Sequence, residues 1–169
     1  MKETPEEMQD LARLMTDSHD RAGPFLKGSL QMPEHSLSPQ QLVAYWTHFR
    51  TAAVATSTAS GDPRVAPTGV GLLRGKWVVP TVAEAARAKA IRRRPATSIA
   101  HFDEGDLAVI VHGYASIVSE GELFEELCAF HREVADGEDV RRWQGTGVYL
   151  LATPSTIYTF ARYPDRFVG

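Results

Sequence analysis

Cysteine is almost absent from this 169-residue sequence, which contains Cys128 alone. A single cysteine cannot form an internal disulfide, so the fold does not depend on an oxidising compartment. No run approaches the roughly 18 apolar residues that a membrane helix needs. The acidic, polar start of the chain also lacks the apolar region of a secretion signal. We therefore expect a cytoplasmic protein in which Cys128 is a small buried hydrophobic residue, with a reactive thiol as the alternative.

An excess of positive charge is also missing, because 18 Lys and Arg stand against 21 Asp and Glu, for a formal net charge of −3. The field of the whole molecule would attract neither nucleic acid nor a membrane surface, which argues against both as general partners. The length suits one globular domain. We expect residues 1–37 to form an N-terminal helix and an irregular arm, and residues 38–169 to form the main domain.

Several motifs that carry chemistry are absent. The sequence has no Gly-x-Ser-x-Gly elbow, no Gly-x-x-x-x-Gly-Lys loop and no Cys-x-x-Cys pair. No two of its six histidines are four residues apart, the spacing of a helical metal site. Nucleophilic catalysis and nucleotide hydrolysis are therefore unsupported, and we expect no metal site. Haem held by a histidine stays open, because nothing in the sequence selects or excludes the ligand.

Two capping boxes predict helices in the first third of the chain. Residues 4–7 (Thr-Pro-Glu-Glu) open a helix whose apolar face ends before Asp17. Residues 38–41 (Ser-Pro-Gln-Gln) open a second helix, and its apolar residues over 42–49 cover much of its surface. Such a helix needs packing on more than one side. The intervening residues 18–37 contain glycines and prolines that predict an irregular arm.

Strand patterns dominate the rest of the chain. β-branched and alternating segments predict strands over 51–58, 64–73, 77–81, 96–102, 107–118, 147–153 and 156–161. An acidic loop is expected over 103–106, and helices over 81–94, 120–134 and around 140–143. The first three strands have connections too short for crossover helices, so a parallel sheet is excluded. The sequence thus predicts a mostly β protein with helical decorations, of class α+β, built on an antiparallel barrel of six or seven strands.

Positive charge gathers in one place, the helix that ends at Pro95. Five basic residues occupy the eight positions from 87 to 94: Arg87, Lys89, Arg92, Arg93 and Arg94. A solvated helix face, with cations near its C-terminus, is one interpretation. A phosphate site is the other: residues 81–84 form a capping box, Thr81 offers a hydroxyl at the helix start, and Arg87 or Lys89 reaches the dianion. Composition alone leaves both open.

Four segments, in this order, resemble the pyridoxamine-phosphate-oxidase-like superfamily. They are the strand–turn–strand over 53–67, the basic helix with Arg87, Ile91 and Pro95, the Val-His-Gly of residues 111–113, and the last strand over 154–160. The similarity covers roughly residues 39–165. It implies a split β-barrel that forms a homodimer and binds FMN, or in some branches a deazaflavin cofactor or haem, in clefts at the dimer interface.

The resemblance also implies which residues hold the cofactor. The strand that passes along the flavin ring and its phosphate matches Arg64, Val65, Ala66, Pro67 and Thr68; the pair at the flavin tail matches Pro80 and Thr81; the phosphate clamp matches Arg87 and Lys89. The implied activity is that of an FMN-dependent oxidoreductase acting on a small organic molecule. A deazaflavin-dependent reductase and a non-catalytic flavin or haem carrier are the alternatives. No catalytic residue is identified.

Two departures from the family pattern argue against vitamin B6 oxidation. The glutamine that begins the family's long strand is Ala108 here, and the C-terminal Arg-x-His motif is missing, since Arg166 is followed by Phe167. Before the glycine of the long strand the family commonly has an acidic residue, and this sequence has His112 there. We interpret His112 as a histidine satisfied on a barrel strand, with a donor at the edge of the flavin ring as the alternative.

Overall fold

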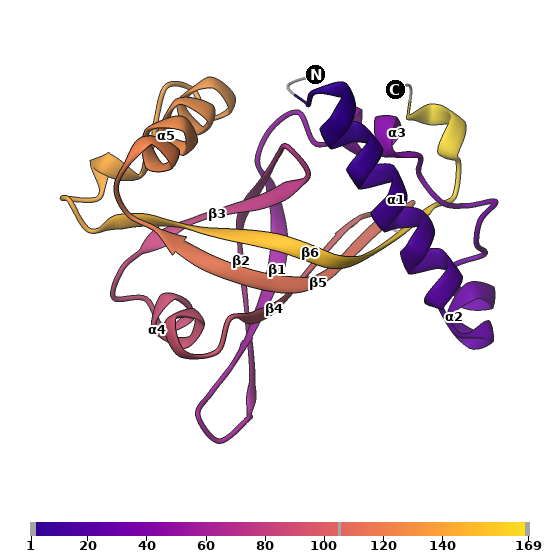
Figure 1. The fold of residues 1–169 in the computed structure, drawn as a ribbon, viewed down its shortest axis with the longest axis horizontal. Helices are drawn as coiled ribbons and strands as arrows, with labels where there is room; N and C mark the ends of the chain where they lie inside the picture. Colours follow the sequence, from indigo (N-terminus) through magenta and orange to yellow (C-terminus); the bar gives the residue numbers. More distant parts are fainter. Residues whose placement is uncertain (1–2, 105, 168–169) are drawn as a thin grey trace.

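Six strands form an antiparallel sheet that closes into a barrel (Figure 1). The computed structural model describes residues 3–104 and 106–167, so the outer ends of the two expected segments and Gly105 of the acidic loop lie outside the described residues. The strands are β1 (Arg50–Ser57), β2 (Pro63–Leu73), β3 (Lys76–Val82), β4 (Ala96–Asp103), β5 (Leu107–Val118) and β6 (Gly147–Ala161). Around the barrel they follow the order β1, β2, β3, β6, β5, β4. The predicted antiparallel barrel and α+β class are confirmed.

Helices cover the two ends of the barrel, with α1 and α2 at one end of the molecule and α5 at the other (Figure 1). Their bounds are α1 (Pro5–Arg21), α2 (Pro24–Ser29), α3 (Pro39–Tyr45), α4 (Ala86–Arg93) and α5 (Glu122–Val134), with 3-10 turns η1 (Val140–Arg142) and η2 (Pro164–Arg166). The helices expected over 120–134 and around 140–143 are thus confirmed. Among the described helices, none has the length and apolar character to cross a membrane.

The N-terminal segment is more regular than the sequence predicts. Both capping boxes are confirmed, but α1 continues past Asp17 to Arg21, and α2 occupies part of the expected irregular arm. The extension of α1 depends on Ser18, which is fully buried. Its hydroxyl donates to the carbonyl of Leu14 and accepts from the backbone N–H of Ile157 in β6. Because this hydrogen bond spans the interface between helix and barrel, α1 packs as part of the barrel's own core.

The barrel core is built from alternate strand residues and two N-terminal helices. Leu11 of α1 and Leu42 of α3 belong to the same buried cluster as Val70, Trp77 and Ile99 of the strands. Burial of such large side chains contributes about 1.5–3 kcal/mol each. The second predicted helix was expected to include the apolar residues over 42–49, but α3 ends at Tyr45. The helix is therefore shorter than predicted, and it covers one end of the barrel.

The two expected C-terminal strands are one continuous strand, β6, paired along its length with β5. Pro154 does not interrupt it, because the register shifts between His112 and Gly113 where Gly113 faces Pro154. The two backbones come so close there that a Cβ on Gly113 would lie 2.2 Å from the carbonyl oxygen of Thr153. This close approach explains why a glycine follows His112.

Substitution of Gly113 by alanine therefore tests the fold. We expect Gly113→Ala to lower the free energy of unfolding by about 1–3 kcal/mol, because the β5–β6 bulge must open to admit the methyl group. Urea denaturation measures this loss. Gly28→Ala in α2 is the matched control, since no atom lies within 4 Å of its added Cβ. A Gly113→Ala protein as stable as the wild type would contradict the close approach.

Two buried histidines are held neutral by their surroundings. His101 lies against the carbonyl oxygen of Thr51 through Nδ1 at 2.8 Å and against the Tyr45 hydroxyl through Nε2 at 2.7 Å. A carbonyl only accepts, so Nδ1 carries the proton and Nε2 accepts from Tyr45. Burial lowers the pKa of His101, and burial also lowers the pKa of His131. Protonation of either ring therefore disfavours the folded state.

These lowered pKa values make stability depend on pH. The unfolded chain takes up protons on both histidines near their ordinary pKa of about 6.5, while the folded chain resists, so the free energy of unfolding falls as the pH drops below about 6.5. We expect His101→Gln to reduce this fall, measured as the change in urea midpoint between about pH 7.5 and about pH 5.5. The exposed His48 supplies the control, His48→Gln. An identical fall in His101→Gln and wild type would sink this explanation.

Candidate functional site

The barrel is incompletely paired in two places, between β1 and β4 and between β2 and β3, with three residue pairs in each. The candidate site lies at the second, where β2 and β3 pair from Gly71 with Val78 to Leu73 with Lys76. Beyond this point β3 continues along β6, while the half of β2 from Pro63 to Val70 pairs with β1 alone within the described residues. The two strands therefore diverge. The start of α4 lies beside the free edge of β2, and a hollow remains between them.

We call this space the Arg87 hollow. It measures about 480 Å³ and is lined by Val54, Thr56, Pro63, Arg64, Val65, Ala66, Ala85, Ala86 and Arg87. Four of the residues expected to hold a cofactor, Arg64, Val65, Ala66 and Arg87, are thus brought together from segments about twenty residues apart. The β1 residues Val54 and Thr56 were not among the expected ones. Their register opposite Ala66 and Arg64 could have indicated them.

Arg87 lines this hollow, and one nitrogen of its guanidinium is buried beside it and unsatisfied. Its Nη1 atom is buried and has no hydrogen-bond partner among the described residues. An unpaired buried donor costs roughly 1–3 kcal/mol, and more when it is charged. No carboxylate lines the Arg87 hollow to compensate it. A phosphate group supplies the missing acceptors and charge, so the residues present fit a phosphorylated cofactor.

The second expected feature of this site is wrong: Thr81 does not cap α4. β3 runs through Val82, and Thr81 is a buried strand residue opposite Val148 of β6. The helix begins at Ala86, and its cap, Ala85, makes no side-chain hydrogen bond. Pairing with β6 over six consecutive residues outweighs one capping box, and β-branched residues such as Thr81 and Val82 favour a strand. The hydroxyl of Thr81 is therefore not at the helix start.

The remaining expected residues lie outside the Arg87 hollow. Pro80 is buried in β3 opposite Tyr149, and Pro67 and Thr68 lie farther along β2. Lys89 is exposed and forms an ion pair with Glu84, with 2.8 Å between Nζ and Oε2. Residues two positions apart on a helix differ by about 200° in direction. Arg87 and Lys89 therefore point to different sides of α4. Their role as one phosphate clamp stays a prediction of the sequence.

Lys89 instead lines a neighbouring space, which we call the basic hollow. It measures about 550 Å³ and is lined by Ser57, Thr58, Arg64, Ala86, Lys89, Ala90, Arg92, Arg93 and Arg94. Arg64 and Ala86 border both hollows. The basic residues that the sequence gathers on this helix therefore line two adjoining spaces on the surface.

His112 lies on the outer face of the barrel and is exposed. Its Nδ1 atom is 2.7 Å from the Ser98 hydroxyl, and its ring meets that of Tyr158 edge-on. This pairing agrees with our interpretation of a satisfied strand histidine. His112 also lines a shallow groove together with Tyr114 and Ala55, on the side of the sheet that includes Val65.

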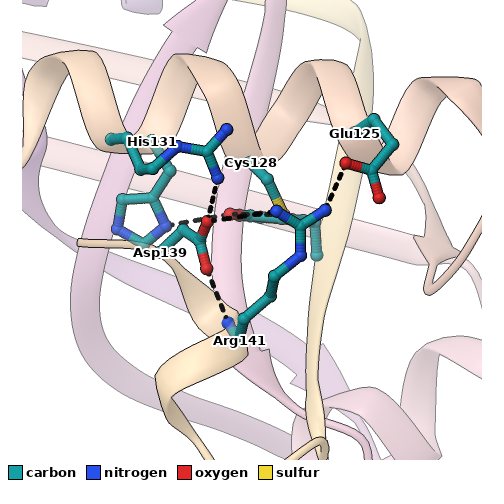
Figure 2. A network of polar contacts seen from close by, with 7 residues as sticks. Glu125, Cys128, His131, Asp139 and Arg141 are labelled. Atoms are coloured by element: carbon teal, nitrogen blue, oxygen red, sulfur yellow. Dashed lines mark hydrogen bonds and ion pairs between the residues drawn. The ribbon is translucent and has the colours of Figure 1, made fainter. Parts of the chain in front are cut away.

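A second polar cluster, under α5, is structural (Figure 2). Asp139 is buried, accepts from the backbone N–H of Arg141 and pairs with Arg132, so it fastens η1 to α5. His131 Nδ1 lies 3.0 Å from the hydroxyl of the fully buried Tyr149.

Cys128 belongs to the same cluster and is fully buried. Burial raises the pKa of its thiol, which keeps it protonated. The interpretation as a small buried residue is confirmed. Within residues 3–104 and 106–167, no three His, Cys, Asp or Glu side chains gather as metal ligands would.

The fold is shared with solved structures of low sequence identity. A conserved hypothetical protein from Mycobacterium tuberculosis superposes with a TM-score of 0.66 at 19% identity, over 81% of this chain and 92% of that one. An F420 reductase gives 0.52 at 16% identity, over 66% and 91%. A FAD-binding protein from Mesorhizobium loti gives 0.53 at 13% identity, over 65% and 82%.

Sequence comparison shows the family of the chain. No curated protein sequence matches the chain. The family described as pyridoxamine 5'-phosphate oxidase matches residues 38–160. This range includes the residues that line both hollows beside α4 and all six strands, apart from the final residue of β6. The chain therefore belongs to the pyridoxamine 5'-phosphate oxidase family.

Proposed function

We propose that this protein is an oxidoreductase that binds a flavin-type cofactor in the Arg87 hollow and acts on a small organic molecule. The observation that carries the proposal is the buried, unpaired Nη1 of Arg87, which needs an anionic partner. FMN, with one phosphate, is the smallest cofactor that meets this need. Solved structures of the same fold include an F420 reductase and a FAD-binding protein, which supports a flavin or deazaflavin.

The chain's own residues would bind and orient the cofactor. Arg87 would donate charge-assisted hydrogen bonds to phosphate, each contributing about 1.5–3 kcal/mol. Val65 and Ala66 offer an apolar wall along the free edge of β2. The lining of the Arg87 hollow includes no Asp, Glu or His. A bound flavin would supply the electron transfer, which needs no acid or base from these residues.

A homodimer is the second part of the proposal. The outer face of β1, β4 and β5 carries small and apolar residues in register: Ala53 opposite Ala100, and Ala100 opposite Ile110. Beside them Val65, Phe102 and Tyr114 are 67%, 74% and 61% exposed. A sheet face in contact with water normally carries polar side chains. This face therefore favours cover by a second copy, and through Val65 it adjoins the Arg87 hollow.

Cofactor affinity tests the role of Arg87. We expect Arg87→Ala to weaken FMN binding about 10-fold or more, the loss of one charge-assisted contact. Flavin fluorescence titration gives the dissociation constant. Lys89→Ala is the control, since Lys89 lies on the other side of α4, and it should change FMN affinity little. Equal dissociation constants for wild type and Arg87→Ala would place the phosphate elsewhere.

The redox activity needs its own measurement. Anaerobic addition of a nicotinamide donor, or of a reduced deazaflavin, should bleach the absorption band of the bound cofactor, because the oxidised ring takes up the electrons. Photoreduced free FMN at the same concentration is the control for the spectrum. A cofactor that binds but is reduced by neither donor would favour a carrier without turnover, and a Soret band on adding haem would favour a haem carrier.

Light scattering tests the dimer. We expect a dimer for the wild type and a monomer for Ile110→Glu, because a carboxylate on the outer face of β5 would be buried unpaired at the interface. Thr16→Glu, on the exposed side of α1, should remain dimeric. A monomeric wild type with cofactor bound would remove this part of the proposal.

A further inference from the structure

A separate cavity lies at the other end of β2 from the Arg87 hollow. It measures about 450 Å³ and is bordered by α1, the β2–β3 turn, the first half of α5 and the middle of β6. None of the described residues that line it borders either hollow beside α4. A strand rises about 3.3 Å per residue, so the length of β2 from Ala66 to Leu73 separates the two sites by roughly 20 Å. The cavity is therefore distinct from the cofactor site.

We call this space the leucine cleft, because leucine side chains from four elements form its floor and walls. They are Leu11, Leu14, Leu73, Leu123, Leu127 and Leu151. Leu11 belongs to the core cluster inside the barrel, whereas Leu73 and Leu127 belong to the apolar cluster that includes α5. The cleft thus lies where two apolar cores meet, and the side chains of neither core fill the space between them.

Leu123 leaves part of this apolar surface open to water. It is 43% exposed, although it is a large apolar side chain, whereas Leu127 one turn later in α5 is fully buried. Sites for small molecules typically measure about 300–1,000 Å³ and combine a mostly apolar lining with a few polar groups. The size and lining of the leucine cleft therefore suit a small molecule with an apolar body.

Charged residues surround the mouth of the cleft, and the carboxylates among them already have partners. Arg74 Nη1 lies 2.6 Å from Oε1 of Glu126 in α5, and Arg74 Nε lies 3.7 Å from Oε1 of Glu7 in α1. Asp10 pairs with Arg13 on the same helix. Arg74 thus links α1 to α5 across the cleft. Walls that are linked before a ligand arrives lose less conformational freedom when it binds.

Lys76 differs from the other charged residues at the mouth. It is exposed, and its ammonium forms no ion pair or hydrogen bond with any described residue. Once the paired groups are set aside, the charge that remains at the mouth is this one cation. A carboxylate on a ligand would complement it, whereas an ammonium would be repelled.

We propose that the leucine cleft binds a small amphipathic anion, whose apolar body lies against the leucines and whose carboxylate pairs with Lys76. Binding there does not require a cofactor in the Arg87 hollow, since the two sites share no lining residue. The ligand would contact α1, α5 and the β2–β3 turn together, an arrangement that only the folded chain provides. It should therefore also raise the melting temperature of the protein.

Three naphthalene compounds with one apolar body and different charges test the site. They are naphthoate, naphthylmethanol and naphthylmethylammonium, all substituted at the same ring carbon. Isothermal titration calorimetry on the full-length protein gives each dissociation constant. We expect naphthoate to bind about 5-fold more tightly than the alcohol, the contribution of one exposed ion pair, and the ammonium to bind more weakly than both.

Two variants with matched controls identify the contacts. Lys76→Gln should bring the affinity for naphthoate down to that for the alcohol, whereas Lys27→Gln, in α2, should leave it unchanged. Leu123→Gln should weaken the binding of naphthoate and the alcohol about 5-fold, because it makes one wall of the cleft polar. Phe25→Gln, which removes an exposed apolar side chain outside the cleft, is its control.

Arg87→Ala separates this site from the cofactor site. We expect it to leave the affinity for naphthoate unchanged, because Arg87 does not line the leucine cleft. Weaker naphthoate binding in Arg87→Ala, with Lys76→Gln silent, would assign the anion to the Arg87 hollow and overturn the proposal. Failure of all three compounds to bind overturns the site, and equal binding or a preference for the ammonium overturns its selectivity for an anion. FMN affinity is measured separately, so the proposed function stands or fails independently.

Discussion

The partial pairing of β2 and β3 is the constraint on which the rest of this structure depends. β1 pairs with β2 along its whole length and with β4 over three residue pairs, so the sheet closes. β2 and β3 separate after three residue pairs. A closed barrel would otherwise leave no free strand edge. The opening between β2 and β3 borders the space that Arg87 lines, and the register of β1 with β2 decides which other side chains border it.

Helix α4 turns that opening into two unlike spaces. Arg87 faces the opening, where burial leaves a guanidinium nitrogen unpaired, and Lys89 faces away, where water and Glu84 compensate it. The same short helix thus presents a half-buried cation with one enclosed nitrogen on one side and a solvated cluster on the other. Arg64 connects the two, since it lies on the strand edge between them.

The outer face of the barrel follows from the same strand alternation. Val54 and Ile99 point inward and are buried, so their neighbours Ala53 and Ala100 point outward. On this face the sequence places alanine and isoleucine where a solvated sheet would carry charge. The result is a face on which small and apolar residues surround the polar pair of His112 and Ser98, and whose margin at Val65 is also the margin of the Arg87 hollow. Subunit association and cofactor binding would therefore involve adjoining residues.

Much of the fold was determined by local sequence. Alternation and turn residues identified all the strands, and the two N-terminal capping boxes located α1 and α3, because these signals act over a few neighbouring residues. Tertiary structure decided the rest. It extended β3 through Thr81 by pairing with β6, joined two strands across Pro154 through the bulge at Gly113, and ordered part of the arm as α2.

The candidate site shows the same division. The family resemblance predicts that Arg64, Arg87 and Lys89 contact the cofactor. The position of α4 beside the free edge of β2 places Arg87 and Lys89 in the linings of two adjoining hollows, with Arg64 in both. Burial and unpaired charge are properties of the assembled surface, so no run of neighbouring residues could have revealed them. The sequence alone determined which types of residue are available. Long-range packing decided which hollow each side chain faces.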